Sequence, residues 1–275
     1  MRCQNPDQAP EIKAPVIQEP DMSDLKKPIG WTGRRWTGIE SAWLILWVWV
    51  VACGLTGCTA SQRYEKMSQR ERLIHDLAVA YGVDQFDQVE RIDFTFNVRL
   101  GDHENSRSWS WRPRTNLVNF DNRFTYHRDQ LLGEADESIH NADRKFINDS
   151  FWLLLPLHLT WSQDVTVQDT GEAMPPLGVQ PAKRVLATYS ASGGGYTPGD
   201  LYELFLNDQN RVTQWVFHRR GVEAPTLVCT WEAYQQVGPL WLAMDHVNKK
   251  TGFRLWFTDV TVWTRDGQTF SAAGP

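Results

Sequence analysis

Four cysteines and seven histidines are the side chains of this 275-residue sequence that most readily bind metals or act as nucleophiles. The cysteines stand at positions 3, 53, 58 and 229 without a Cys-x-x-Cys pair, so their spacing predicts neither a zinc site nor a disulfide framework. The histidines stand at positions 75, 103, 127, 140, 158, 218 and 246, and no two of them are spaced as neighbours on one helix face. The sequence therefore predicts no metal and no cofactor.

Other signatures of catalysis are missing as well. The glycine-rich stretch 193–199 contains neither a dinucleotide-binding nor a Walker motif, and Gly-x-Ser-x-Gly is absent from the sequence. We therefore expect a protein that is not an enzyme. A hydrolase with a site assembled from distant Asp, Glu and His side chains stays an open alternative, and loss of activity on changing His127 or His158 to Ala would support it.

The composition is that of an ordinary globular domain with a mild acidic excess. Lys and Arg number 28 against 33 Asp and Glu, which gives a formal net charge of −5. A nucleic-acid-binding protein needs a surplus of basic residues to neutralise phosphates, and none exists here. Hydrophobic residues make up 41% of the chain, which excludes a disordered or collagen-like protein.

Residues 1–57 have the features of a leader and not of a folded segment. Residues 1–21 show no apolar periodicity, and Met22 is the start codon that best fits an export signal of ordinary length. Basic residues at positions 26, 27, 34 and 35 precede the apolar run 42–51. That run is shorter than the roughly 20 residues that a membrane-spanning helix needs. The pattern therefore predicts a cleaved signal peptide.

The four residues Leu55-Thr56-Gly57-Cys58, which follow the apolar run, resemble the lipobox of bacterial lipoproteins. The resemblance implies that the Cys58 thiol is acylated and that cleavage makes Cys58 the first residue of the mature chain. Each buried methylene of the acyl chains would then contribute about 0.8 kcal/mol to membrane attachment. Thr59 stands where an Asp would favour the inner membrane, so the resemblance implies a lipoprotein of the cell envelope at the periplasmic face of the outer membrane.

Residues 58–275 are expected to form a single α+β domain. Apolar residues recur at helical spacing over 61–81, with Gly82 as the C-terminal stop, and again over 136–151. The strands show alternation and no βαβ rhythm, so the sheet is predicted to be antiparallel with roughly ten strands. The expected strand segments are 89–100, 108–112, 117–120, 123–127, 184–189, a hairpin over 201–217, 226–231, 240–246 and 253–263.

Two local features carry further expectations. Asn148, Asp149 and Ser150 interrupt an apolar passage, and such side chains are expected to bond to the backbone and fix the end of the second helix. The apolar residues 153–157 that follow them are expected to be buried. Cys229 lies in a strand-like run and is expected to be a buried apolar side chain and not a nucleophile.

Fourteen tryptophans are many for this length, and they have two interpretations. Trp is large and amphipathic, and in the first interpretation these side chains fill the hydrophobic core. Alternatively, aromatic side chains line one concave sheet face and hold an apolar guest. The candidate residues for this hollow or its lid are Phe94, Phe96, Trp109, Trp111, Phe146, Trp152 and Trp215.

The order of elements resembles that of the LolA/LolB-type lipoprotein carriers. The resemblance covers most of residues 61–265 and includes the Tyr-x-Leu-x-Leu-Asn-Asp-Gln-Asn-Arg-Val hairpin at 202–212 and the segment 146–156. It implies an antiparallel open (half) β-barrel capped by two helices, with acyl chains bound in an apolar hollow. No binding residue of the carriers matches this sequence securely.

The leading hypothesis is therefore a non-enzymatic envelope lipoprotein that binds a lipid or acyl chain by apolar burial. Its predicted partners are that lipid, the membrane through Cys58, and other envelope proteins, with no nucleic acid. The second hypothesis is a protein–protein interaction module whose sheet is filled by its own side chains.

Overall fold

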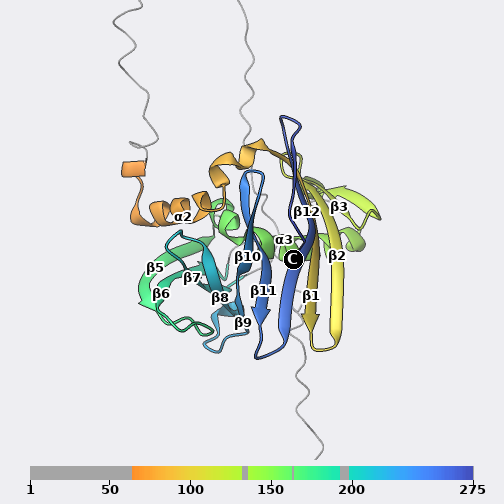
Figure 1. The fold of residues 1–275 in the computed structure, drawn as a ribbon. Helices are drawn as coiled ribbons and strands as arrows, with labels where there is room; N and C mark the ends of the chain where they lie inside the picture. The colour runs from red at the N-terminus through yellow and green to blue at the C-terminus, as the bar shows by residue number, and fades with distance from the viewer. Residues whose placement is uncertain (1–63, 132–135, 163, 193–197, 275) are drawn as a thin grey trace, which may run out of the picture.

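The computed structural model describes residues 64–131, 136–162, 164–192 and 198–274 (Figure 1). The expected leader and Cys58 lie outside these residues. The described part of the chain forms thirteen strands in two antiparallel sheets, with two α-helices and three short 3-10 helices. Among the described residues no helix is both long and apolar enough to span a membrane.

The larger sheet has eight strands. Its order is β10 (Glu232–Val237), β11 (Leu240–Asn248), β12 (Phe253–Thr264), β1 (Val89–Leu100), β2 (His103–Arg112), β3 (Leu117–Phe120) and β4 (Phe124–His127), and β13 (Thr269–Ser271) also pairs with β12. Strands β1 and β12 pair along most of their length, from Val89 opposite Thr264 to Arg99 opposite Arg254. This pair forms the centre of the sheet.

The smaller sheet has five strands in sequential order. They are β5 (Val165–Ala173), β6 (Ala182–Tyr189), β7 (Leu201–Leu206), β8 (Val212–His218) and β9 (Leu227–Thr230). Side chains join β9 to β11 of the larger sheet: the Asn248 amide donates to the Val228 carbonyl at 2.9 Å, and the Thr230 hydroxyl bonds to the Val247 backbone. Strands β4 and β5 end the two sheets without pairing to each other, so the wall is curved but not closed.

The first described helix, α2 (Gln69–Val79), is shorter than the sequence predicted. Ser68 starts it with a capping box, in which the Ser68 hydroxyl accepts from the Glu71 N–H and the Glu71 carboxylate accepts from the Ser68 N–H. Gly82 follows the helix at φ 87°, the left-handed conformation expected of it. The 3-10 helix η2 (Val83–Gln88) then leads directly into β1.

The second helix, α3 (Glu137–Trp161), begins after Asp136 as predicted but extends ten residues beyond the predicted end at Phe151. The expectation that Asn148, Asp149 and Ser150 fix a helix end is wrong, because they lie in the middle of α3. The helix continues through Pro156 with a break at Leu154, where φ is −124° and ψ is 18°. Proline removes one backbone hydrogen bond and commonly kinks a helix whose surroundings hold it in place.

Helix α3 lies on the concave side of both sheets, behind them in the view of Figure 1. From Asp149 to Leu157 every side chain of the helix is buried, which confirms the predicted burial of residues 153–157. A helix that is apolar on all sides must be surrounded by protein. The core of the domain is therefore the layer between this helix and the curved wall.

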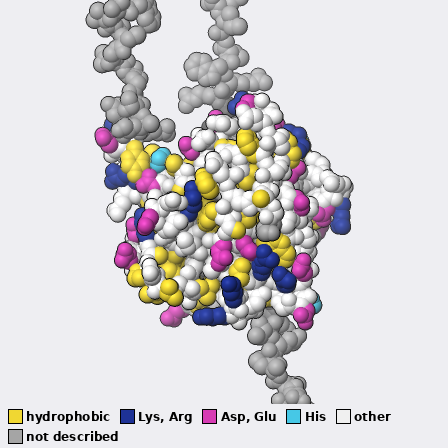
Figure 2. All heavy atoms as spheres, in the orientation of Figure 1, with side chains coloured by type: hydrophobic (Ala, Val, Ile, Leu, Met, Phe, Trp, Pro, Cys, Tyr) yellow, Lys and Arg dark blue, Asp and Glu magenta, His cyan; other side chains and the backbone are white. Residues whose placement is uncertain are grey.

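Strand β1 shows how the wall separates its two faces. Ile92, Phe94 and Phe96 are buried toward α3, while Asp93 and Thr95 alternate with them on the outer face. Figure 2 shows this outer face as mostly polar, with Lys and Arg side chains next to Asp and Glu side chains over the lower parts of the central strands. The apolar surface of the sheets is thus directed to the inside.

The α+β class, the antiparallel pairing and the open half-barrel predicted from the sequence are confirmed. Thirteen strands replace the roughly ten expected, because strands such as β10 and β13 show little alternation of apolar and polar residues. The single domain over 58–275 stays a prediction, since its first residues are not described.

Candidate functional site

The seven aromatic residues predicted to line a hollow come together in the interior of the half-barrel. Five are on the wall, in β1, β2 and β8, and two are on α3. All are between 1% and 8% exposed and belong to one continuous core. They are Phe94, Phe96, Trp109, Trp111, Trp215, Phe146 and Trp152. Whether these residues bind a ligand stays a prediction.

One group of these rings lies around the first half of α3. Phe146 contacts the edges of Trp109 and Trp111, at centroid distances of 5.5 and 5.7 Å. Phe94 and Phe96 both contact Phe257 of β12 at 6.0 Å. This group joins α3 to the larger sheet by apolar contact.

A second group lies where the two sheets meet, and we call it the seam cluster: Trp152, Trp215, Trp231 and His246. Trp152 of α3 contacts Trp215 of β8 at 4.2 Å and His246 of β11 at 5.5 Å. Trp231, between β9 and β10, contacts Trp215 at 5.8 Å and His246 at 4.5 Å. Four separate segments of the chain therefore contribute to one cluster.

His246 and Trp231 were not predicted as site residues. The pattern of β11 contained a signal for His246, because Leu242, Met244 and His246 alternate on one strand and all three are buried. No comparable signal existed for Trp231, which lies between two short strands and depends on the junction of the sheets for its position.

The seam cluster contains polar atoms that are buried without a hydrogen-bond partner among the described residues. The Trp215 indole interacts with the Cys229 thiol and one ring nitrogen of His246 with the Thr230 backbone, which leaves the Trp231 indole nitrogen and the other His246 nitrogen without a partner. Elsewhere in the interior the same holds for Trp111 Nε1, His158 Nε2 and the Tyr189 hydroxyl. A buried donor or acceptor without a partner costs about 1–3 kcal/mol, so such groups normally bond to water or to a ligand.

Burial keeps His246 and His158 uncharged. It lowers the pKa of His246 to about 3, with the backbone of Thr230 acting in the opposite direction. It also lowers the pKa of His158 to about 3, and the Arg128 charge acts in the same direction. A neutral imidazole offers one N–H donor and one nitrogen acceptor. With the His246 N–H directed to the Thr230 backbone and the Trp215 indole to the Cys229 thiol, the seam cluster presents one free donor, on Trp231, and one free acceptor, on His246.

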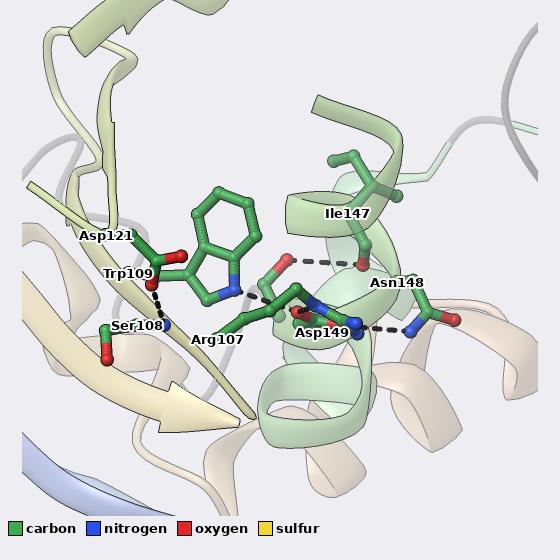
Figure 3. Close-up of polar contacts among 8 residues, drawn as sticks. Arg107, Ser108, Trp109, Asp121, Ile147, Asn148 and Asp149 are labelled. Carbon is green, nitrogen blue, oxygen red and sulfur yellow. Dashed lines mark hydrogen bonds and ion pairs between the residues drawn. The ribbon is translucent and has the colours of Figure 1, made fainter. Parts of the chain in front are cut away.

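A buried carboxylate, Asp149, lies in the middle of α3 and is directed to Arg107 and Trp109 of β2 (Figure 3). Arg107 of β2 donates to both its oxygens, at 2.7 and 2.6 Å, and Trp109 Nε1 donates to Oδ2 at 2.8 Å. The Asn148 amide donates to Oδ1 at 3.0 Å. Burial raises the pKa of Asp149, and the bonds from Arg107, Asn148 and Trp109 act against that rise.

Asp143, one and a half turns earlier in α3, makes a similar contact. Arg128 Nε donates to its Oδ1 at 2.7 Å, and the Tyr126 hydroxyl donates to the same atom at 3.1 Å. Both acids join α3 to the strand region 107–128 of the larger sheet. Each of the two carboxylates is paired with an arginine side chain. This pairing indicates that the acids fix the position of the helix.

The side chains named for a hydrolase lie in different surroundings. His127 is exposed at the end of β4 and its Nδ1 lies 3.2 Å from the Thr115 carbonyl, whereas His158 is in contact with the rings of Phe151 and Trp161. Cys229 is fully buried, as predicted, and burial raises the pKa of its thiol well above the usual range. In the described part of the chain no three His, Cys, Asp or Glu side chains are grouped to hold a metal ion.

Comparison with solved structures finds three proteins with a partly similar fold. A LolA superfamily protein from Nitrosomonas europaea is 8% identical, with a TM-score of 0.42, over 70% of this chain and 93% of that one. An outer membrane lipoprotein-sorting protein domain from Vibrio parahaemolyticus is 11% identical, with a TM-score of 0.41, over 74% of this chain and 92% of that one. A DUF1329 family protein from Desulfovibrio piger is 11% identical, with a TM-score of 0.36, over 70% of this chain and 93% of that one.

LolA-type proteins, to which the sequence shows a resemblance, are thus among the structural neighbours. No family model matches the sequence, and no curated protein matches it. Because the TM-scores and identities are low, these likenesses assign neither a family nor a function to this chain.

We expect Asp149→Ala to lower the free energy of unfolding by about 3–5 kcal/mol, because it leaves the Arg107 charge buried without its partner. Urea denaturation at pH 7 measures the change. The matched control is Glu90→Ala, which removes the exposed Arg112–Glu90 pair and should cost at most about 1 kcal/mol. Equal losses in the two variants would contradict the role assigned to Asp149.

The buried histidines make stability depend on pH in a stated direction. Between the ordinary histidine pKa of about 6.5 and the folded pKa of about 3, only the unfolded chain binds the proton. Stability is therefore complete above neutral pH and falls as the pH falls. Each buried histidine should account for a loss of about 2 kcal/mol between pH 7 and pH 5.

His246→Phe should remove about half of this pH-dependent loss, which urea denaturation at the two pH values would measure. His103→Gln, at an exposed position in β2, is the matched control and should leave the loss unchanged. If His246→Phe behaves like His103→Gln, then His246 is not held neutral by the fold.

Proposed function

We propose that this chain is a non-enzymatic cell-envelope lipoprotein, anchored through Cys58, whose half-barrel holds the acyl chain of a lipid. The observation that carries the proposal is the continuous apolar inner wall, in which Phe94, Phe96, Trp109, Trp111 and Trp215 face one interior. Burial of an acyl chain there contributes about 0.8 kcal/mol for each methylene removed from water. Such binding needs no charged contact.

In this proposal α3 occupies the volume that the acyl chain takes in the loaded state. The break at Leu154 and the proline at 156 separate the second half of the helix from the first. The first half is held by the ion pairs of Asp143 and Asp149, whereas the second half is in contact with aromatic and aliphatic side chains. The second half is therefore the part that we expect to move aside.

The anchor would place α2 close to the membrane. Tyr64, the first described residue, lies six positions after Cys58 and donates its hydroxyl to Asp76 of α2 at 2.8 Å. An extended chain of that length reaches at most about 20 Å. We therefore propose that the side of the domain that carries α2 faces the bilayer.

One observation favours a second function, that of a protein–protein interaction module. All seven candidate residues are covered by the chain's own side chains, as in a core that is simply filled. In that case other envelope proteins would be the partners, and the interior would take up no lipid.

Lipid uptake separates these two functions. The full chain with Cys58→Ser, which carries no attached acyl group, is purified, extracted with organic solvent and offered fatty-acid methyl esters of increasing length. We expect uptake, measured by mass spectrometry, to strengthen about fourfold for each added methylene, because each contributes about 0.8 kcal/mol. No uptake, or uptake that does not depend on length, would leave the interaction module as the function.

Membrane attachment tests the anchor separately. The wild-type chain should be found in the membrane fraction of the cell that exports it, and Cys58→Ser should release it, since the thiol is the proposed acylation site. Cys53→Ser, five positions earlier in the expected leader, is the matched control and should stay in the membrane. Release of both variants, or of neither, would contradict the assignment of Cys58.

A further inference from the structure

We propose that the seam cluster binds the uncharged polar end of the lipid, an ester carbonyl with a neighbouring hydroxyl as in an acylglycerol. This inference rests on the proposed function and specifies the class of lipid. Its basis is the Trp231 indole nitrogen and the His246 ring nitrogen that does not interact with Thr230, both of which are buried without a partner among the described residues.

The first step concerns the position of these groups. Trp231 contacts both Trp215 and His246, so the three polar rings form one contiguous set, and each residue is at least nine-tenths buried. Trp152 of α3 covers the set through contacts with Trp215 and His246. A ligand that enters beside Trp152 therefore reaches the rings of His246 and Trp231, whose centroids are 4.5 Å apart.

The second step concerns the kind of atom that fits. An indole has only a donor, so Trp231 requires an acceptor such as a carbonyl oxygen. The N–H of neutral His246 is directed to the Thr230 backbone, so its other ring nitrogen is an acceptor that requires a hydroxyl or N–H on the ligand. A carbonyl with an adjacent hydroxyl satisfies the whole set, whereas an alkyl chain satisfies none of it.

The third step concerns charge. The nearest element that brings cations into the interior is β2, whose Arg107 is already bonded to Asp149. The outward side chains of β11 and β12 nearest the seam, Asp245 and Arg254, are bonded to each other. A carboxylate or phosphate in the seam would be buried without a counter-ion, which is costly in an apolar interior. The polar end is therefore uncharged.

The experiment compares three lipids with 18-carbon chains that differ in their polar atoms. The probes are 1-monooleoylglycerol, methyl oleate, which lacks both hydroxyls, and octadecane, which lacks all polar atoms and the double bond. They are offered to the full chain carrying Cys58→Ser, and the bound amount is measured by mass spectrometry. We expect 1-monooleoylglycerol to bind best and octadecane least, with about three- to tenfold between compounds for each hydrogen bond gained.

Two variants test the residues. Trp231→Phe and His246→Phe keep a ring but remove its polar atoms, so each should reduce the preference for 1-monooleoylglycerol over octadecane by about three- to tenfold. Octadecane binding should not fall in either variant. Trp263→Phe, on the outer face under Arg91, is the matched control and should leave the preference unchanged.

The indole N–H signals in ¹⁵N NMR spectra give an independent readout. The Trp231 signal, assigned from its loss in Trp231→Phe, should shift on addition of 1-monooleoylglycerol and stay in place with octadecane. Persistent contact of this N–H with water in the loaded protein would overturn the inference, because water would then be its partner.

The outcomes separate the inference from the function on which it rests. Equal binding of all three lipids would overturn the inference and leave acyl-chain binding intact. Binding of none of them would overturn the proposed function and the inference together.

Discussion

The burial of α3 inside the curved wall is the interaction on which the rest of this structure depends. Each sheet has an apolar inner face, and the helix between Asp149 and Leu157 is buried on every side. Neither could remain exposed to water without a large loss of the hydrophobic free energy that drives folding. The open wall and the helix therefore require each other, and any ligand of the interior competes with α3 for the same surface.

Apolar packing has little directional preference, so other contacts must fix how α3 lies. Asp143 and Asp149 do this, because charge-assisted bonds to Arg128 and Arg107 hold only at short distances and defined angles. Both acids precede the break at Leu154. In the described part of the chain, the side-chain bonds of Asp143 and Asp149 to the larger sheet thus fix the first half of α3, and the second half is held by packing. This asymmetry is what makes displacement of the second half a reasonable loading step.

Much of the fold could be predicted from local patterns, while the site depended on contacts between distant segments. The strict alternation in 89–100 predicted β1 with its observed bounds, and Asp136 marked the start of α3. The predicted end of α3 was wrong, because it rested on Asn148, Asp149 and Ser150 as polar residues that end a helix. Asp149 can lie in the middle of the helix because Arg107 pairs with it, and Arg107 is 42 positions away in the sequence.

The choice of side chains at the seam separates a filled core from a binding interior. Phe253 and Phe257 contact the same cluster, so this chain uses phenylalanine there where only apolar volume is needed. Trp231 and His246 occupy equivalent buried positions but add nitrogen atoms whose desolvation destabilises the empty domain. Selection for stability alone would favour phenylalanine or leucine at both positions. Polar rings kept at a cost to stability are typical of sites where a ligand or an ordered water completes the hydrogen bonds.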